Sequence, residues 1–315
     1  MRYLKSLLVF ALVLIFILPL CIQATGQSNE NLTTTYAKAD SIGIFYAAQN
    51  FKTHQLATQV LISDCKTQLE KARAIFSFVA HRVKYDFNTN AYEADEVLKH
   101  KYAVCQGYAN LIDAMMTDAG IESKVITGYT KAQVNITHHD VTKTNHAWNA
   151  IKINNTWQLI DATWGAGSYD YGTKKFTALF EENYFLADPE MMKYTHFPLD
   201  TSWQLLDKKV DAVTFINYPF AWRGFEIHNI TNISPDKFKL KYKAGEKFIL
   251  SFTSDENVEH PLVNIEGERY SYPFEFKNIK DKQYSSEIEL KFKGTKQVTF
   301  FLNGTGVATY MVTVN

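Results

Sequence analysis

The stretch NHAWNAIKINNTWQLID, residues 145–161, has the pattern of a β-hairpin. Two runs rich in apolar residues flank Asn154 and Asn155, and asparagine tolerates the positive φ angles that a two-residue hairpin turn requires. With these residues as the turn, Ile153 lies opposite Thr156, and the pairing of every residue further out is then fixed. We therefore predict an antiparallel hairpin with a defined register.

The predicted register brings a histidine close to a carboxylate. In it, Trp148 lies opposite Asp161 and His146 lies opposite Thr163. His146 is then the diagonal neighbour of Asp161 on one face, about 7–8 Å away between backbones, a gap that an imidazole and a carboxylate can bridge. The carboxylate would fix the tautomer of the ring and stabilise its protonated form. A slip of one residue would send the two side chains to opposite faces.

Cys105 is predicted to stand at the start of a helix that ends near Gly120. The apolar positions that follow the cysteine with helical spacing are Ala109, Ile112, Met115, Met116 and Ala119. A helix N-terminus favours the thiolate form of a cysteine, and its free backbone N–H groups could hold an oxyanion formed during acyl transfer. Cys105, His146 and Asp161 are therefore a candidate nucleophile, base and orienting carboxylate.

Each of these three residues also has a structural explanation. His146 and Asp161 could be ordinary sheet residues, and Cys105 could be a small buried hydrophobe, which is our interpretation of Cys65. Because the predicted helix start and the hairpin register agree with one another, the combination favours an active site.

Three aromatic residues close to the candidate catalytic residues are predicted to bind substrate, namely Tyr108, Trp148 and Trp164. Core packing is the alternative explanation for both tryptophans. Residues 131–144 are predicted to form a polar loop beside the site that offers little apolar wall. Such a loop would leave an acyl-enzyme open to water, so hydrolysis is expected to outweigh transfer to an amine.

The rest of the chain divides into regions with different patterns. Residues 67–83 carry an apolar stripe with helical spacing, with Asp64 as the predicted N-cap, and residues 125–129 are typical of a strand. Further on, apolar and polar residues alternate in five short runs. We predict an α+β catalytic domain with an N-terminal helical extension over residues 27–217 and an antiparallel, immunoglobulin-like β-sandwich over residues 218–315.

Residues 1–26 have the features of a signal peptide. A basic start precedes an apolar run, residues 7–18, and small residues lead to a cleavage site before Gln27. The run is shorter than the roughly 20 residues that a membrane span needs, and no later stretch approaches that length. We expect an exported protein, secreted or periplasmic. A lipid anchor at Cys21 is less favoured, because Leu20 is bulky where a small residue is required.

The composition excludes some classes of function. Lys plus Arg and Asp plus Glu both number 33 in 315 residues, so the formal net charge is zero and nucleic acid is not an expected partner. The chain has three cysteines, one of them in the leader, which are too few for a disulfide framework. No motif indicates a metal or an organic cofactor.

Several stretches resemble the transglutaminase-like superfamily. They are YAVCQGYA at 102–109, AGI at 119–121, NHAWN at 145–149 and WQLIDATWG at 157–165. Later stretches resemble its kyphoscoliosis-peptidase-like branch, namely YFL at 184–186, HFP at 196–198 and WQLL at 203–206. The resemblance implies a papain-like core and acyl-transfer chemistry, often proteolytic, with Cys105, His146 and Asp161 as the triad.

The chain departs from papain-like enzymes just before the cysteine. Where those enzymes carry a glutamine, this sequence has Lys99, His100 and Lys101, so the resemblance supplies no side chain for an oxyanion hole. We predict an exported thiol enzyme that cleaves amide bonds of proteins or peptides through an acyl-enzyme. The alternatives are transglutaminase-type transfer to an amine, or a non-catalytic module that binds a protein or surface polymer. The C-terminal domain could contact a cell-surface partner.

Overall fold

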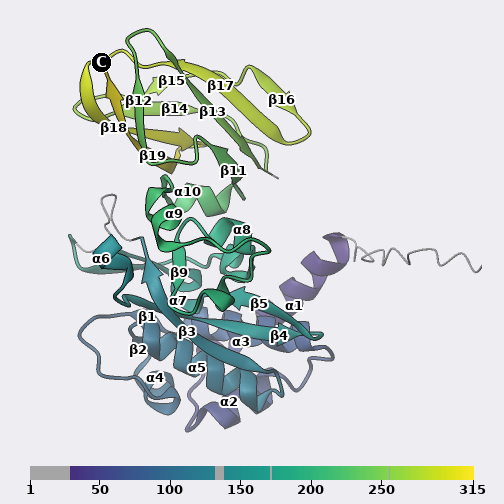
Figure 1. The fold of residues 1–315 in the computed structure, drawn as a ribbon. Coiled ribbons are helices and arrows are strands. Elements are labelled where there is room, and N and C mark those ends of the chain that lie inside the picture. The colour runs from purple at the N-terminus through teal and green to yellow at the C-terminus, as the bar shows by residue number, and fades with distance from the viewer. Residues whose placement is uncertain (1–28, 132–137, 171, 255) are drawn as a thin grey trace, which may run out of the picture.

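The computed structural model in Figure 1 describes residues 29–131, 138–170, 172–254 and 256–315. The predicted signal peptide and Cys21 lie outside these residues. Within the described ranges, no helix combines the length and the apolar character that crossing a membrane requires. The fold is mixed: helices and an antiparallel sheet form the first part, and an antiparallel β-rich region forms the C-terminal part.

Helices α1 to α5 form a layer against one face of the first sheet (Figure 1). Their bounds are Asn29–Ala47, His54–Leu61, Gln68–Arg82, Ala94–His100 and Cys105–Asp118. Helix α3 begins with a capping box, in which the Thr67 hydroxyl accepts from the N–H of Glu70 and the Glu70 carboxylate accepts from the N–H of Thr67. The prediction of Asp64 as the cap was wrong, because Thr67 and Glu70 together satisfy two N–H groups.

The first sheet has five strands in the order β8-β5-β4-β3-β9, all antiparallel. Their bounds, in chain order from β3, are Ser123–Thr130, His146–Ile153, Thr156–Ile160, Phe185–Ala187 and His196–Pro198. The strand predicted over residues 125–129 is confirmed as part of β3. Helix α5 packs on β4, where the Asn149 side chain donates to the carbonyl of Ala109 at 3.0 Å. This contact fixes the helix that begins at Cys105 against the strand that begins at His146.

The hairpin predicted from residues 145–161 is confirmed near its turn. Asn154 and Asn155 have φ angles of 49° and 65°, and Ile153 pairs with Thr156. The paired ladder ends earlier than predicted, at Asn149 and Ile160. The next residue, Asp161, caps the short helix α7 (Ala162–Ala166), so the pairings predicted for Trp148 with Asp161 and for His146 with Thr163 were wrong.

The C-terminal part consists of two sheets around one apolar core. One sheet has the order β10-β19-β18-β14-β15, with β12 pairing in parallel with β19, and the other has the order β11-β13-β17-β16. The predicted alternation is confirmed, since Phe248, Phe300 and Tyr310 point into the shared core. The strands β11 to β19 are Thr231–Ser234, Lys239–Tyr242, Lys247–Thr253, Leu262–Ile265, Tyr272–Pro273, Asn278–Lys280, Gln283–Glu289, Gly294–Leu302 and Thr305–Val314.

Short elements connect the two parts (Figure 1). They include α8 (Pro189–Met192), α9 (Ala212–Asn217), β10 (Phe220–Ala221) and α10 (Arg223–Ile227). The strands β6 (Gly167–Asp170) and β7 (Lys175–Ala178) form a separate hairpin within the first part, between α7 and β8. The junction is apolar. Met191 and Tyr194 lie in the C-terminal core, and the ring of Phe215 in α9 packs against Tyr129 and Phe197 of the first sheet.

Lys131 is buried in this junction. Its ammonium group donates to the carbonyl of Tyr218 at 3.2 Å and lies 4.6 Å from the centre of the Phe215 ring. Burial lowers the pKa of Lys131 to about 7. The predicted loop does start at this residue, since β3 ends at Thr130, but Lys131 is buried because α9 covers the end of β3. Residues 132–137 of that loop lie outside the described ranges.

Candidate active site

Cys105 is the first residue of α5, as predicted. The N-cap Val104 has an extended backbone, and its carbonyl accepts the first helical hydrogen bonds from Gly107 and Tyr108. The N–H groups of Cys105 and Gln106 therefore have no acceptor within the helix. Cys105 is half-buried.

His146 and Asp161 form a buried ion pair. Nε2 of His146 lies 2.7 Å from Oδ2 of Asp161, and the two side chains are 6% and 0% exposed. Oδ1 of the same carboxylate accepts from the N–H groups of Thr163 and Trp164 at 2.8 and 3.1 Å. Helix α7 thus fixes the position of the carboxylate, which in turn fixes the imidazole.

The imidazole of His146 and the N–H of Ala147 both stabilise the thiolate form of Cys105. Because Nε2 of His146 faces Asp161, Nδ1 is the nitrogen that remains for the sulfur. Burial alone would raise the pKa of Cys105, but the hydrogen bond and charge of His146 outweigh it and the pKa is lowered. The geometry therefore favours a thiolate and imidazolium pair.

The pKa values of His146 and Asp161 shift in opposite directions. Burial would lower the pKa of His146, but the carboxylate of Asp161 and the sulfur of Cys105 raise it overall. Burial would raise the pKa of Asp161, yet His146 and His196 hold it well below its usual range. The imidazole is thus protonated and the carboxylate ionised together.

His196 is a fourth member of the cluster, which the hairpin argument could not predict. It lies in β9, where Thr130 is its partner in β3, and its Nε2 is 3.2 Å from Oδ2 of Asp161. Burial lowers the pKa of His196, so the ring is a neutral donor to the carboxylate. The local sequence gives no signal for this contact. Only the resemblance at residues 196–198 pointed to this strand.

The three side chains of His146, Asp161 and His196 lie close enough to hold a metal ion, with their ligand atoms within 4.8 Å of one another. Both imidazole nitrogens approach the same carboxylate oxygen, Oδ2, at hydrogen-bonding distance. A metal ion at this position would occupy the Nε2 lone pair of His146 and displace the ion pair with Asp161. We therefore assign hydrogen bonds here.

The residues predicted to bind substrate have different surroundings. Trp164 lines a cavity of about 480 Å³ that also contains His146. Trp148 is 2% exposed, and its ring stacks on His146 with a centroid distance of 5.9 Å. Tyr108 is 1% exposed, and its hydroxyl donates to the carbonyl of Val83. Only Trp164 of the three lines the cavity, whereas Trp148 and Tyr108 pack beneath the catalytic cluster.

Cys65 differs from Cys105 in its surroundings. Like Cys105, it is half-buried, whereas the sequence predicted full burial. Its thiol donates to the carbonyl of Leu61 at 3.5 Å. The expectation of a buried hydrophobe was wrong in this respect. Burial, followed by the nearby carboxylate of Glu70, raises the pKa of Cys65.

We expect iodoacetamide to alkylate Cys105 rapidly well below pH 8.5, the usual pKa of a free thiol. The lowered pKa keeps the thiolate present until the pH falls through it, whereas the raised pKa of Cys65 delays its reaction to higher pH. Mass spectrometry of the two cysteine-containing peptides between pH 5 and 9 measures both rates in one protein. Equal rates that rise together near pH 8.5 would contradict the assignment.

The comparisons agree with this geometry. Residues 55–162, which include Cys105, His146 and Asp161, match the model of the transglutaminase-like superfamily. This core belongs to the transglutaminase-like superfamily. The predicted resemblance is therefore confirmed.

Relatives of the transglutaminase-like core include proteins named as peptidases. Human kyphoscoliosis peptidase is 35% identical over 221 residues, which cover 65% of this chain and 33% of that protein. Hillarin from Drosophila melanogaster is 28% identical over 290 residues, which cover 85% of this chain and 33% of that protein. A solved structure of a TGase is 13% identical, covers 52% of this chain and 40% of its own, and has a TM-score of 0.29. The chain spans about a third of the length of these curated relatives.

We expect His196→Phe to lower kcat roughly ten- to hundredfold, because a hydrogen bond to a charged group contributes about 1.5–3 kcal/mol. The ring would still pack against Trp164, but Asp161 would lose its second imidazole donor. If His196 has a purely structural role, the pH dependence of Cys105 alkylation stays unchanged in the variant. If His196 positions Asp161 for the reaction, Cys105 becomes reactive only at higher pH. His196→Gln, which restores an N–H donor, should recover part of the activity. A wild-type pH profile in His196→Phe would remove this residue from the mechanism.

Proposed function

We propose that the protein is a thiol hydrolase that cleaves amide bonds of proteins or peptides. Cys105 acts as the nucleophile, His146 as the acid and base, and Asp161 as the orienting carboxylate. The observation that carries the proposal is the buried 2.7 Å contact between His146 and Asp161, next to a half-buried cysteine at a helix N-terminus. The peptidase names of relatives support the same class of reaction.

In the proposed reaction, the sulfur of Cys105 attacks the carbonyl carbon of the amide, and the free N–H at the start of α5 stabilises the oxyanion. His146, which holds the proton of the thiol, donates it to the leaving amine as the C–N bond breaks. Water then loses a proton to His146 and attacks the thioester. The acid product leaves as the C–S bond breaks, and the thiolate of Cys105 and the imidazolium of His146 are restored.

The oxyanion donor is proposed to be a backbone group rather than a side chain. Lys99 and His100, which stand where papain-like enzymes have a glutamine, are exposed at the end of α4. The N–H of Cys105 belongs to the first turn of α5 and has no helical acceptor. This arrangement supports backbone stabilisation of the developing charge.

A screen of the mature protein against peptide mixtures, read by mass spectrometry, tests the proposed function. We expect products shortened by hydrolysis, each cleavage adding the mass of one water. Fast alkylation of Cys105 together with no product from any mixture would favour the alternative of a binding module.

We expect hydrolysis to outweigh amine transfer when peptide substrate is offered with a large excess of n-butylamine. Water and an amine compete for the same thioester, and the outcome depends on how well the cleft excludes water. Three polar side chains, Thr130, Asn145 and Thr163, line the cavity together with His146, which supports the presence of water near the thioester. Mass spectrometry distinguishes the free acid from the butylamide. A majority of butylamide product would make the protein a transglutaminase.

We further propose export and a two-domain organisation. The leader over residues 1–26 motivates export, and N-terminal sequencing of the secreted or periplasmic form should begin at Gln27. The papain-like domain is proposed to extend to residue 217 and an immunoglobulin-like sandwich to follow it. The two packed sheets after residue 230 support the sandwich. A cell-surface partner would bind this second domain.

A further inference from the structure

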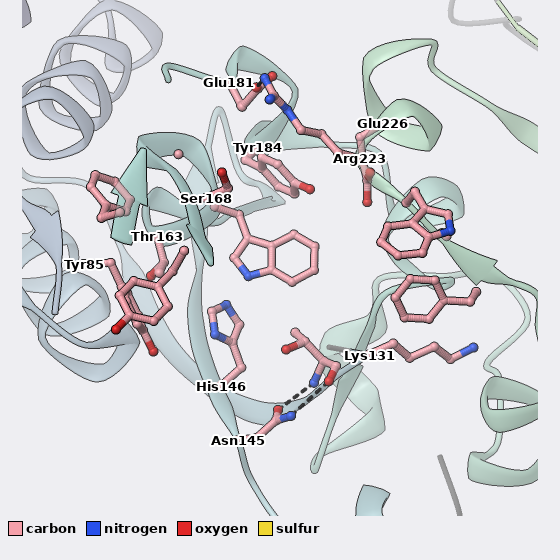
Figure 2. A pocket seen from close by; sticks show the side chains of 18 of the residues that line it. Tyr85, Lys131, Asn145, His146, Thr163, Ser168, Glu181, Tyr184, Arg223 and Glu226 are labelled. Atoms are coloured by element: carbon pink, nitrogen blue, oxygen red, sulfur yellow. Dashed lines mark hydrogen bonds and ion pairs between the residues drawn. The ribbon is translucent and has the colours of Figure 1, made fainter. Parts of the chain in front are cut away.

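The cavity next to His146 has a second wall, which comes from the segment that follows residue 217. Phe220, Trp222, Arg223 and Glu226 belong to β10, α10 and the turn between them, and all four line the cavity. Figure 2 shows His146 on one side of the cavity and Glu226 on the other, with the hydroxyl of Tyr184 turned toward Glu226. The C-terminal part of the chain thus contributes to the cavity that His146 lines.

Glu226 is a buried carboxyl group without a well-formed hydrogen bond. The residue is 3% exposed, and neither of its carboxylate oxygens has a partner of good geometry among the described residues. A buried polar group that lacks a partner costs free energy, so such a group in a cavity wall suggests a missing ligand. Burial raises the pKa of Glu226 to about 8, against the lowering effects of its own N–H, Tyr184 and Arg223. A cation bound beside Glu226 would lower this pKa and so stabilise the carboxylate form.

The one arginine in the cavity wall does not neutralise Glu226. The guanidinium of Arg223 forms an ion pair with the carboxylate of Glu181, which lines the same cavity (Figure 2). Lys131 also lines the cavity, but its ammonium group is directed to the carbonyl of Tyr218 and the ring of Phe215. Within the described residues, Glu226 therefore lacks a cation of its own.

The remaining lining is unusually rich in aromatic rings. Eight aromatic side chains contribute to it, namely Tyr85, Phe87, Trp164, Tyr169, Phe176, Tyr184, Phe220 and Trp222. The faces of tryptophan, tyrosine and phenylalanine attract cations, most strongly where water is excluded. A carboxylate among aromatic rings is the arrangement that recognises an alkylammonium group.

We propose that Glu226, together with aromatic side chains of the cavity such as Tyr184, binds a primary ammonium group of the substrate, while the scissile carbonyl lies at Cys105. The ammonium group is either the α-amino group of a peptide or the end of a lysine side chain, since both present the same charge to a carboxylate. The proposal rests on the proposed function for the position of the carbonyl, but ammonium binding itself requires no catalysis.

A binding experiment with the inactive Cys105→Ala protein tests the site directly. Ligand-detected NMR titrations at pH 7.5 compare n-butylamine, which represents a lysine side chain, and glycinamide, which represents an α-amino group. 1-Pentanol is the neutral control, and butyrate is the anionic one. We expect at least one amine to bind tenfold or more tightly than 1-pentanol, and the preferred amine identifies the source of the ammonium group.

We then add Glu226→Gln to the Cys105→Ala protein. This double variant should bind the preferred amine at least tenfold more weakly and retain its affinity for 1-pentanol. Glu181→Gln is the matched control, because Glu181 lines the same cavity but is paired with Arg223; its effect should stay below about threefold. Equal amine affinity with and without Glu226, or tighter binding of butyrate than of n-butylamine, would overturn the proposal. If Glu226→Gln fails to fold, Glu226→Asp, which keeps the charge but shortens the side chain, must weaken amine binding.

Failure of this site and failure of the proposed function give different results. Alkylation of Cys105 by iodoacetamide, a neutral reagent, reports on the thiolate and should be equally fast in wild type and Glu226→Gln. Fast alkylation without amine binding would remove the ammonium site and leave the hydrolase proposal standing. Amine binding with slow alkylation would contradict the hydrolase proposal and leave the ammonium site standing.

Discussion

Replacing Cys105 with alanine is expected to lower turnover by more than about 10⁴-fold, because members of a catalytic triad act as a unit and the nucleophile is lost. The fold should remain intact. Alanine is a better helix former than cysteine, and the residue occupies the first turn of α5, where the side chain is half-buried. Peptide cleavage measured by mass spectrometry, together with the melting temperature, checks both parts of the expectation.

Cys65→Ala is the matched control for this experiment. Cys65 is also half-buried, but its thiol contacts the carbonyl of Leu61 and no imidazole. We expect it to retain wild-type turnover. Full activity in Cys105→Ala would mean that cleavage does not use this thiol. Loss of activity in both variants, with both folded, would indicate that cysteine substitution harms the protein in some other way.

The short-range geometry of the site was predictable from local pattern. The two asparagines fixed the turn, and the register that follows from this turn predicted which residues share a face with His146. The helix that begins at Cys105 followed from apolar spacing and Gly120. The predicted contact between His146 and Asp161 is present although the pairing of β4 with β5 ends before these residues. Asp161 caps α7 instead, and in this position its carboxylate lies beside the ring of His146.

Other features depend on contacts between distant segments, and no local pattern encodes them. His196 reaches Asp161 only because β9 pairs with β3. Lys131 looks like a loop residue in the sequence, yet α9 covers it. Glu226 comes from a short helix after the predicted domain boundary, so the cavity wall could not be assembled from the motifs alone.

Replacing Asp161 with asparagine is expected to lower kcat by roughly 10³–10⁴-fold while the protein stays folded. The amide oxygen can still accept from the N–H groups of Thr163 and Trp164, so the start of α7 is preserved. The amide nitrogen would then face the Nε2 atoms of His146 and His196, which now donate to Oδ2. The N–H donors of His146 and His196 would then face the new NH₂ donor without an acceptor between them. The clash with His146 ends when the proton leaves Nε2 of that ring.

That change of tautomer is what should remove activity. A proton on Nδ1 faces the sulfur of Cys105, so a neutral imidazole in this form cannot take the proton of the thiol. The thiolate also loses its stabilised imidazolium, so alkylation of Cys105 near pH 6 should slow together with kcat. Asp188→Asn is the matched control, because Asp188 caps α8 with the same kind of contact on the exposed surface. Wild-type kcat and alkylation in Asp161→Asn would mean that the buried ion pair serves the fold and not the reaction.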